Sequence, residues 1–192
     1  MELGKKVNYN MAHDTIKILA ICGSLRESSL NSLIIRTVAA MMPANVQYTI
    51  YNDMAQIPAF DDGNTVPPAV ATFRQLFTDA DGVFICTPEY AFGVPGALKN
   101  ALDWTVGTSE FVDKPLALIT AASLGKNAHA ALLLIFKAIS ANIPEGGSLL
   151  IPYIRTKINE QGEIKDDGTQ EEIMNVMESL INLIKSKRNE NA

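Results

Sequence analysis

The sequence predicts an α/β fold in which a five-stranded, mainly parallel sheet carries helices on both faces. The chain has 192 residues, of which 47% are hydrophobic and 19% charged, as is typical of one globular domain with a single sizeable core. Five apolar runs of strand length recur along it, with helical periodicity between them. The runs are continuous rather than alternating, which is expected of strands that helices cover on both sides.

The predicted elements alternate from strand to helix along the chain. The strands are predicted over residues 16–22, 46–51, 82–87, 115–122 and 148–153. Apolar residues at three- and four-residue spacing predict helices over residues 30–41, 66–77, 97–102, 127–141 and 173–184. No repeat or linker interrupts this pattern, so we expect one domain over residues 15–188. The polar residues 1–14 are expected to form a flexible N-terminal extension.

Charge and composition argue against several classes of protein. The formal net charge is −5, so the chain has no basic field with which to hold nucleic acid. No apolar stretch approaches the roughly 20 residues that cross a bilayer. The N-terminus lacks a secretory signal, and two cysteines are too few for a disulfide framework. We therefore expect a cytoplasmic protein that binds neither nucleic acid nor membrane.

The ligand site is expected at the carboxyl ends of the strands. In an open, doubly wound sheet, ligands bind in the crevice outside these ends, where the strand order reverses. The segments to consider therefore follow the first, third and fourth strands, at residues 23–32, 88–95 and 123–127.

The first of these loops is suited to a phosphate group. Hydroxyl, amide and guanidinium side chains are concentrated in it, at Ser24, Arg26, Ser28, Ser29, Asn31 and Ser32. They surround a helix start, where unpaired N–H groups and a partial positive charge favour an anion. A helix cap alone would account for one or two of these residues. The sequence contains neither G-x-G-x-x-G nor G-x-x-x-x-G-K-[ST], which argues against Rossmann-type dinucleotide binding and P-loop hydrolysis.

The second loop is short and bounded by prolines. Pro88 ends the third strand, and Pro95 suits the first turn of the next helix. The N–H groups from Glu89 and Tyr90 onward are suited to the polar edge of a planar ring whose phosphate tail lies in the first loop. Glu89 is the one carboxylate in the loop, so we assign no catalytic side chain and expect a cofactor to carry the chemistry.

Both loops resemble the NADPH-dependent FMN reductase family, a flavodoxin-like group that includes quinone, azo and chromate reductases. The first loop matches through Gly-Ser-Leu-Arg-x-x-Ser-x-Asn at residues 23–31. The second matches through Thr-Pro-Glu-Tyr at residues 87–90, followed by Pro-Gly-x-Leu-Lys-Asn-Ala-x-Asp-Trp at residues 95–104. The resemblance implies a flavodoxin-like three-layer sandwich with strand order 2-1-3-4-5.

The same resemblance implies a reaction and its partners. FMN is the expected cofactor, NADPH or NADH the electron donor, and a quinone, azo compound, chromate, ferric chelate or free flavin the acceptor. A homo-oligomer, dimer or tetramer, is also expected, with the helix over residues 95–104 at its interface. The predicted cofactor contacts are Ser24, Arg26, Ser29, Asn31, Ser32, Pro88, Glu89, Tyr90, Gly93 and Ser123.

The resemblance also leads to three more specific expectations for this site, one of which leaves two roles open. Pro88, Glu89 and Tyr90 are expected to line the isoalloxazine ring, and Ser123 is either a flavin contact or a helix N-cap. The family usually has Asn where this chain has Ala91, which predicts the loss of a side-chain amide contact.

Other functions are weaker interpretations of the same fold. A non-enzymatic electron carrier like flavodoxin would be expected to have a Thr-Gly-Asn-Thr type phosphate loop, which this chain lacks. A receiver domain needs acidic residues where this chain has Cys22-Gly23 and Thr87-Pro88. Cys22 and Cys86 are expected to be small buried hydrophobes rather than a redox dithiol. The two histidines do not predict a metal site.

Overall fold

The fold is a five-stranded parallel sheet with the strand order β2-β1-β3-β4-β5, as predicted. The computed structural model describes residues 15–63, 65–159, 161 and 163–190. The predicted extension over residues 1–14 therefore lies outside the described residues.

The helices and strands follow one another in the predicted alternation. The strands are β1 (Ile16–Cys22), β2 (Val46–Tyr51), β3 (Gly82–Thr87), β4 (Leu116–Ala121) and β5 (Ser148–Ile151). The α-helices are α1 (Leu30–Met41), α2 (Pro68–Asp79), α3 (Gly96–Asp103), α4 (Lys126–Ala138) and α5 (Asp167–Glu190). The described residues also include the short 3-10 helices η2 (Met54–Gln56) and η3 (Ile154–Lys157).

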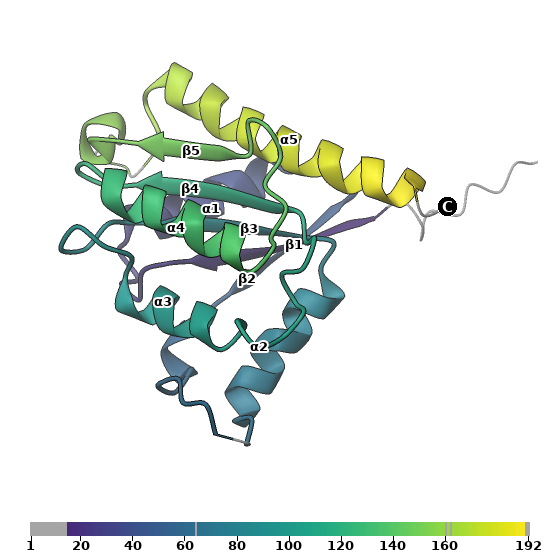
Figure 1. Cartoon of the computed structure of the whole chain (residues 1–192). Coiled ribbons are helices and arrows are strands. Elements are labelled where there is room, and N and C mark those ends of the chain that lie inside the picture. Colours follow the sequence, from purple (N-terminus) through teal and green to yellow (C-terminus); the bar gives the residue numbers. More distant parts are fainter. Residues whose placement is uncertain (1–14, 64, 160, 162, 191–192) are drawn as a thin grey trace, which may run out of the picture.

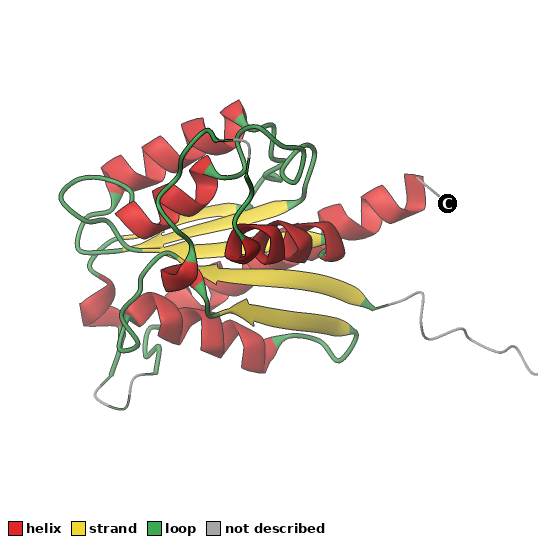
Figure 2. Ribbon diagram, turned by 90° about the horizontal axis from the view of Figure 1, so that it is seen from below, coloured by secondary structure: helices red, strands yellow, loops and turns green. Residues whose placement is uncertain are grey.

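The helices cover the sheet on both sides and make three layers (Figures 1 and 2). One core cluster joins Leu19 and Ile21 of β1 to residues of α2, α3 and α4, and the other joins Ile18 and Ala20 to residues of α1 and α5. Alternate residues of one strand thus point into opposite layers. The central strands β3 and β4 are buried along their whole length, which explains their continuous apolar runs.

The edge strand β2 differs from the expected pattern. Its residues alternate between partly buried and exposed up to the buried Tyr51, because a strand at the edge of the sheet is covered less completely. At the other edge β5 ends at Ile151, two residues earlier than predicted. Pro152 has no N–H for the ladder, and Tyr153 has a left-handed backbone with φ of 55°.

Prolines and a glycine determine where two helices begin. Pro68 occupies the first turn of α2, so this helix starts two residues later than predicted. Gly125, with φ of 83°, precedes the first residue of α4.

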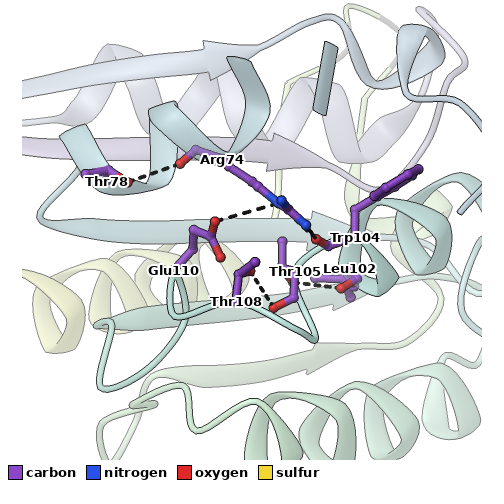
Figure 3. A network of polar contacts seen from close by, with 7 residues as sticks. All are labelled: Arg74, Thr78, Leu102, Trp104, Thr105, Thr108 and Glu110. Carbon is purple, nitrogen blue, oxygen red and sulfur yellow. Dashed lines mark hydrogen bonds and ion pairs between the residues drawn. The ribbon is translucent and has the colours of Figure 1, made fainter. Parts of the chain in front are cut away.

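Polar contacts hold the two loops that flank α3. Figure 3 shows Arg74 of α2, whose guanidinium donates to the carbonyl of Trp104 and whose Nε lies 3.7 Å from Glu110 Oε1. On the other side of α3, Asn100 Nδ2 and Trp104 Nε1 each donate to the carbonyl of Pro58 at 2.9 Å. The N–H of Phe60 completes this contact by donating to Asn100 Oδ1 at 2.7 Å.

Candidate functional site

Three loops meet at the carboxyl ends of the central strands, at the left of Figure 1. They enclose an open cavity of about 150 Å³, here termed the central cavity. Its lining includes most of the predicted contact residues, namely Arg26, Ser29, Asn31, Pro88, Glu89, Tyr90 and Ser123. Ser24 and Ser32 instead line a neighbouring cavity beside β2, and Gly93 is in the lining of neither.

The first loop offers an anion site at the start of α1. Ser29 is the N-cap of this helix, and its hydroxyl accepts a hydrogen bond from the N–H of Asn31 at 3.2 Å. Ser29 therefore both caps α1 and lines the central cavity. Within the described chain, the N–H groups of Glu27 and Ser28 donate to no protein acceptor. Unpaired donors at a helix N-terminus suit a phosphate.

Asn31 connects the first loop to the sheet. Its side chain is almost fully buried, with 3% exposed, and its Nδ2 donates to the carbonyl of Ala121 at 3.1 Å. Its Oδ1 accepts from Cys86 Sγ at 3.3 Å. The amide predicted to contact a cofactor is thus engaged with β3 and β4, and it positions the start of α1.

The two cysteines lie side by side in the sheet without forming a disulfide. They are register partners on β1 and β3, with Cys86 fully buried and Cys22 partly buried. Burial raises the pKa of the Cys86 thiol well above its ordinary value, and the neighbouring Cys22 adds to this effect. A thiol that resists ionisation is a poor nucleophile, which agrees with the predicted role as a buried hydrophobe.

Ser24 joins the first loop to the second. Its side chain is 7% exposed, and its Oγ lies 3.0 Å from the hydroxyl of Tyr90. The same Oγ accepts from the N–H of Arg26 at 3.3 Å. Ser24 therefore fixes the relative position of the two loops.

The second loop contains a tight left-handed turn. The N–H of Tyr90 donates to the carbonyl of Gly93 at 3.0 Å, and the N–H of Gly93 donates back at 2.9 Å. Between them, Ala91 and Phe92 have φ of 48° and 60°. The expectation that the N–H of Tyr90 is free was wrong, because the turn uses it. A left-handed backbone also explains why Asn suits the position of Ala91, since Asn tolerates this region better than Ala.

Glu89 links the second loop to the third. Its Oε2 accepts from the N–H groups of Asn127 at 2.8 Å and Ala128 at 2.9 Å, and its Oε1 accepts from that of Gly125 at 3.2 Å. The carboxylate thus caps α4, where negative charge is favoured by the helix dipole. Ser123 is not the N-cap, since that position is occupied by Gly125.

This role of Glu89 as the cap of α4 was not predicted from the sequence. Two features of the sequence could have indicated it. The helix after Gly125 has no side chain at its N-cap position, and Glu89 is the one carboxylate in the loop that follows the neighbouring strand. The contact of Asn100 and Trp104 with the β2–α2 loop was not predicted either. In the same segment Leu98, Ala101, Leu102 and Trp104 are buried.

Metal-binding clusters and membrane-spanning helices are both absent from the described part of the chain. There, no group of three or more His, Cys, Asp or Glu residues is placed to hold a metal ion. Over the same residues, no helix has both the length and the apolar character to span a membrane.

Comparisons with known proteins agree with the geometry. The sequence model of the NADPH-dependent FMN reductase family matches residues 16–156. A quinone reductase of Escherichia coli K12 is 34% identical over 174 residues, which cover 81% of this chain and 88% of that protein. An NAD(P)H-dependent FMN reductase of Pseudomonas aeruginosa is 32% identical over 179 residues, which cover 87% and 94%.

Solved structures share the fold at lower sequence identity. The flavoenzyme NAD(P)H:(acceptor) oxidoreductase FerB of Paracoccus denitrificans superposes with a TM-score of 0.72 and 21% identity, covering 90% of this chain and 98% of that one. The matched region of the family model includes all three loops of the central cavity. The chain belongs to the NADPH-dependent FMN reductase family.

Proposed function

We propose that the central cavity holds FMN and that the chain uses it to pass electrons from NAD(P)H to a quinone-type acceptor. Family membership makes the chain an NAD(P)H-dependent flavin oxidoreductase rather than an electron carrier. We assign FMN to this cavity because the anion site at the start of α1 and the proline-bounded loop after β3 line it together.

The residues that line the central cavity offer groups suited to a phosphate tail and to part of the attached aromatic ring. The phosphate would lie at the start of α1, between the guanidinium of Arg26, the hydroxyls of Ser28 and Ser29, and the free N–H groups there. Pro88 and Tyr90 would meet the ring, and the N–H of Glu89, which has no acceptor in the described chain, would meet its polar edge. When bound, FMN supplies the two-electron chemistry, and the protein supplies position and electrostatics.

The rim of the central cavity suits a planar, weakly polar acceptor. Exposed apolar side chains lie in or directly beside its lining segments, with Tyr90 45%, Leu124 47%, Tyr153 60% and Phe92 71% exposed. Aromatic side chains can stack on a flat substrate such as a quinone. The Escherichia coli relative is a quinone reductase, and a Burkholderia relative that is 29% identical is a 2-hydroxy-1,4-benzoquinone reductase.

The remaining features of the proposal are a cytoplasmic location and a homo-oligomer, dimer or tetramer. Exposed Val106, Val112 and Leu134, on or near α3 and α4, favour self-association on that side of the sheet. Light scattering after gel filtration measures the mass of the assembly, and a monomer at micromolar concentration would contradict the oligomer.

The visible spectrum of freshly purified protein tests the cofactor assignment. We expect an oxidised flavin band that disappears on addition of NADPH without oxygen and returns when a quinone is added. Protein that is colourless and does not bind added FMN would contradict the proposal. A flavin band that NADPH and NADH leave unchanged would contradict the assigned electron donor.

A further inference from the structure

A second cavity lies beside the central cavity, on the side of β2. It has a volume of about 440 Å³ and is formed by the ends of β1 and β2, the β1–α1 loop, the first two turns of α1, and η2. We term it the β2-side cavity. Arg26 lines both cavities, so they are adjacent and share one cationic side chain.

The lining of the β2-side cavity combines apolar and cationic groups. Ile35, Ile50 and Met54 provide apolar surface, while Arg26 and Arg36 provide two guanidinium groups. Neither arginine takes part in an ion pair or side-chain hydrogen bond within the described chain. Glu27 is the one acidic residue in the lining. Unpaired arginines beside an apolar surface match a ligand that carries a phosphate on a flat, weakly polar body.

We propose that the β2-side cavity binds the phosphorylated adenosine half of NADPH, with Arg36 recognising its 2′-phosphate. This inference rests on the proposed function, because it requires the nicotinamide to reach a flavin in the central cavity. The two cavities share Arg26, so an adenosine half bound in the β2-side cavity would lie next to the flavin site that the nicotinamide must reach. Arg36 lines the β2-side cavity but not the central cavity, so it distinguishes a donor site from a flavin site.

Arg36→Gln removes the second cation without touching the central cavity. A charge-assisted contact to phosphate is worth at least a factor of about ten in affinity. We therefore expect the ratio of kcat/KM for NADPH to kcat/KM for NADH to fall at least about tenfold, because NADH lacks the 2′-phosphate. The matched control is Lys185→Gln, which removes one positive charge from an exposed position of α5. It should leave the ratio unchanged.

Glu27→Gln is the reciprocal variant. Removing the one acidic side chain of the lining reduces repulsion of a dianion, so the same ratio should rise by a factor of about three. An unchanged ratio in Arg36→Gln would overturn the proposal. So would a loss of FMN affinity in Arg36→Gln without a change in the ratio, since the cavity would then belong to the flavin.

Direct binding separates this inference from the proposed function. Titration calorimetry with adenosine 2′,5′-bisphosphate and adenosine 5′-monophosphate requires neither bound flavin nor turnover. We expect the bisphosphate to bind the wild-type protein at least about tenfold more tightly, and Arg36→Gln to lose this preference. Colourless protein that still shows the preference would contradict only the flavin assignment. Equal affinity for both nucleotides in protein that binds FMN would contradict only the donor site.

Discussion

Glu89 connects two of the loops that line the central cavity, the one after β3 and the one before α4. Its carboxylate follows β3 and accepts three N–H groups at the start of α4. A carboxylate has two acceptor oxygens and a side-chain amide has one, so an amide at this position cannot satisfy all three N–H groups equally well. The contribution of Glu89 can therefore be tested by a substitution that keeps its size.

Glu89→Gln should lower both stability and flavin affinity. The amide offers one acceptor oxygen and turns an NH₂ group toward backbone N–H groups, so we expect the free energy of unfolding to fall by about 2 kcal/mol. Urea unfolding of the flavin-free protein measures the first effect, and fluorescence titration with FMN the second. The matched control is Glu145→Gln at an exposed position, which should change neither. Equal stability of Glu89→Gln and wild type would show that the cap contributes nothing.

Ala91 is a residue whose backbone conformation suits another side chain. With φ of 48° it lies in the left-handed region, which costs alanine about 1 kcal/mol. We expect Ala91→Asn to raise the free energy of unfolding by about 0.5–1 kcal/mol. Ala44→Asn, at an exposed turn position without a positive φ, should give no such gain. If Ala91→Asn is more stable but binds FMN with unchanged affinity, the Asn side chain acts at this position through the backbone conformation and not through a contact to the cofactor.

At the scale of elements, α3 holds the β2–α2 loop against the sheet. Asn100 accepts from Phe60 N–H and donates to Pro58 O, while the rings of Phe60 and Trp104 meet edge to face at 5.2 Å. Residues of the same connection, including Met54, line the β2-side cavity. The motif that the sequence shares with its family in α3 therefore positions a neighbouring loop as well as packing the core.

Asn100→Ala should release this loop. Two hydrogen bonds are lost, so we expect the free energy of unfolding to fall by about 1–2 kcal/mol, and amide exchange to become faster over residues 57–63. Hydrogen-exchange mass spectrometry locates the effect. Asn182→Ala, at an exposed position of α5, is the matched control, since both substitutions replace Asn by Ala within a helix. Uniformly faster exchange in Asn100→Ala would point to global destabilisation rather than a released loop.

At the scale of the whole molecule, stability should depend on pH through His129. Its Nδ1 lies 2.9 Å from Thr120 Oγ1, and burial lowers its pKa below the ordinary value. As the pH falls, the unfolded chain therefore binds the proton first. The free energy of unfolding is unaffected by this group above about pH 7.5 and decreases as the pH falls through the unfolded pKa of about 6.5.

Urea unfolding at several pH values tests this assignment. Between about pH 7.5 and pH 5.5 we expect a loss of stability in the wild-type protein that is smaller in His129→Gln, which keeps a hydrogen-bonding group toward Thr120. The two proteins should differ by a constant amount above this window. Parallel curves across the whole range would show that other groups carry the dependence.

The sequence by itself determined the sheet, its layers and the loops that carry the site. Continuous apolar runs, helical periodicity and two family motifs are local patterns, so the strand order and most lining residues of the central cavity followed from them. The boundaries that differed lie where proline or a left-handed residue ends an element, as at Pro152 and Tyr153.

Tertiary structure alone decided which partners the polar side chains take. Glu89 could equally have faced a ligand or a helix start, and Asn31 a cofactor or the sheet, because hydrogen bonds between distant segments leave no periodic trace in the sequence. The sharing of Arg26 by two cavities has the same origin. Such contacts depend on how loops converge in space, whereas strands and helices depend on patterns that neighbouring residues already contain.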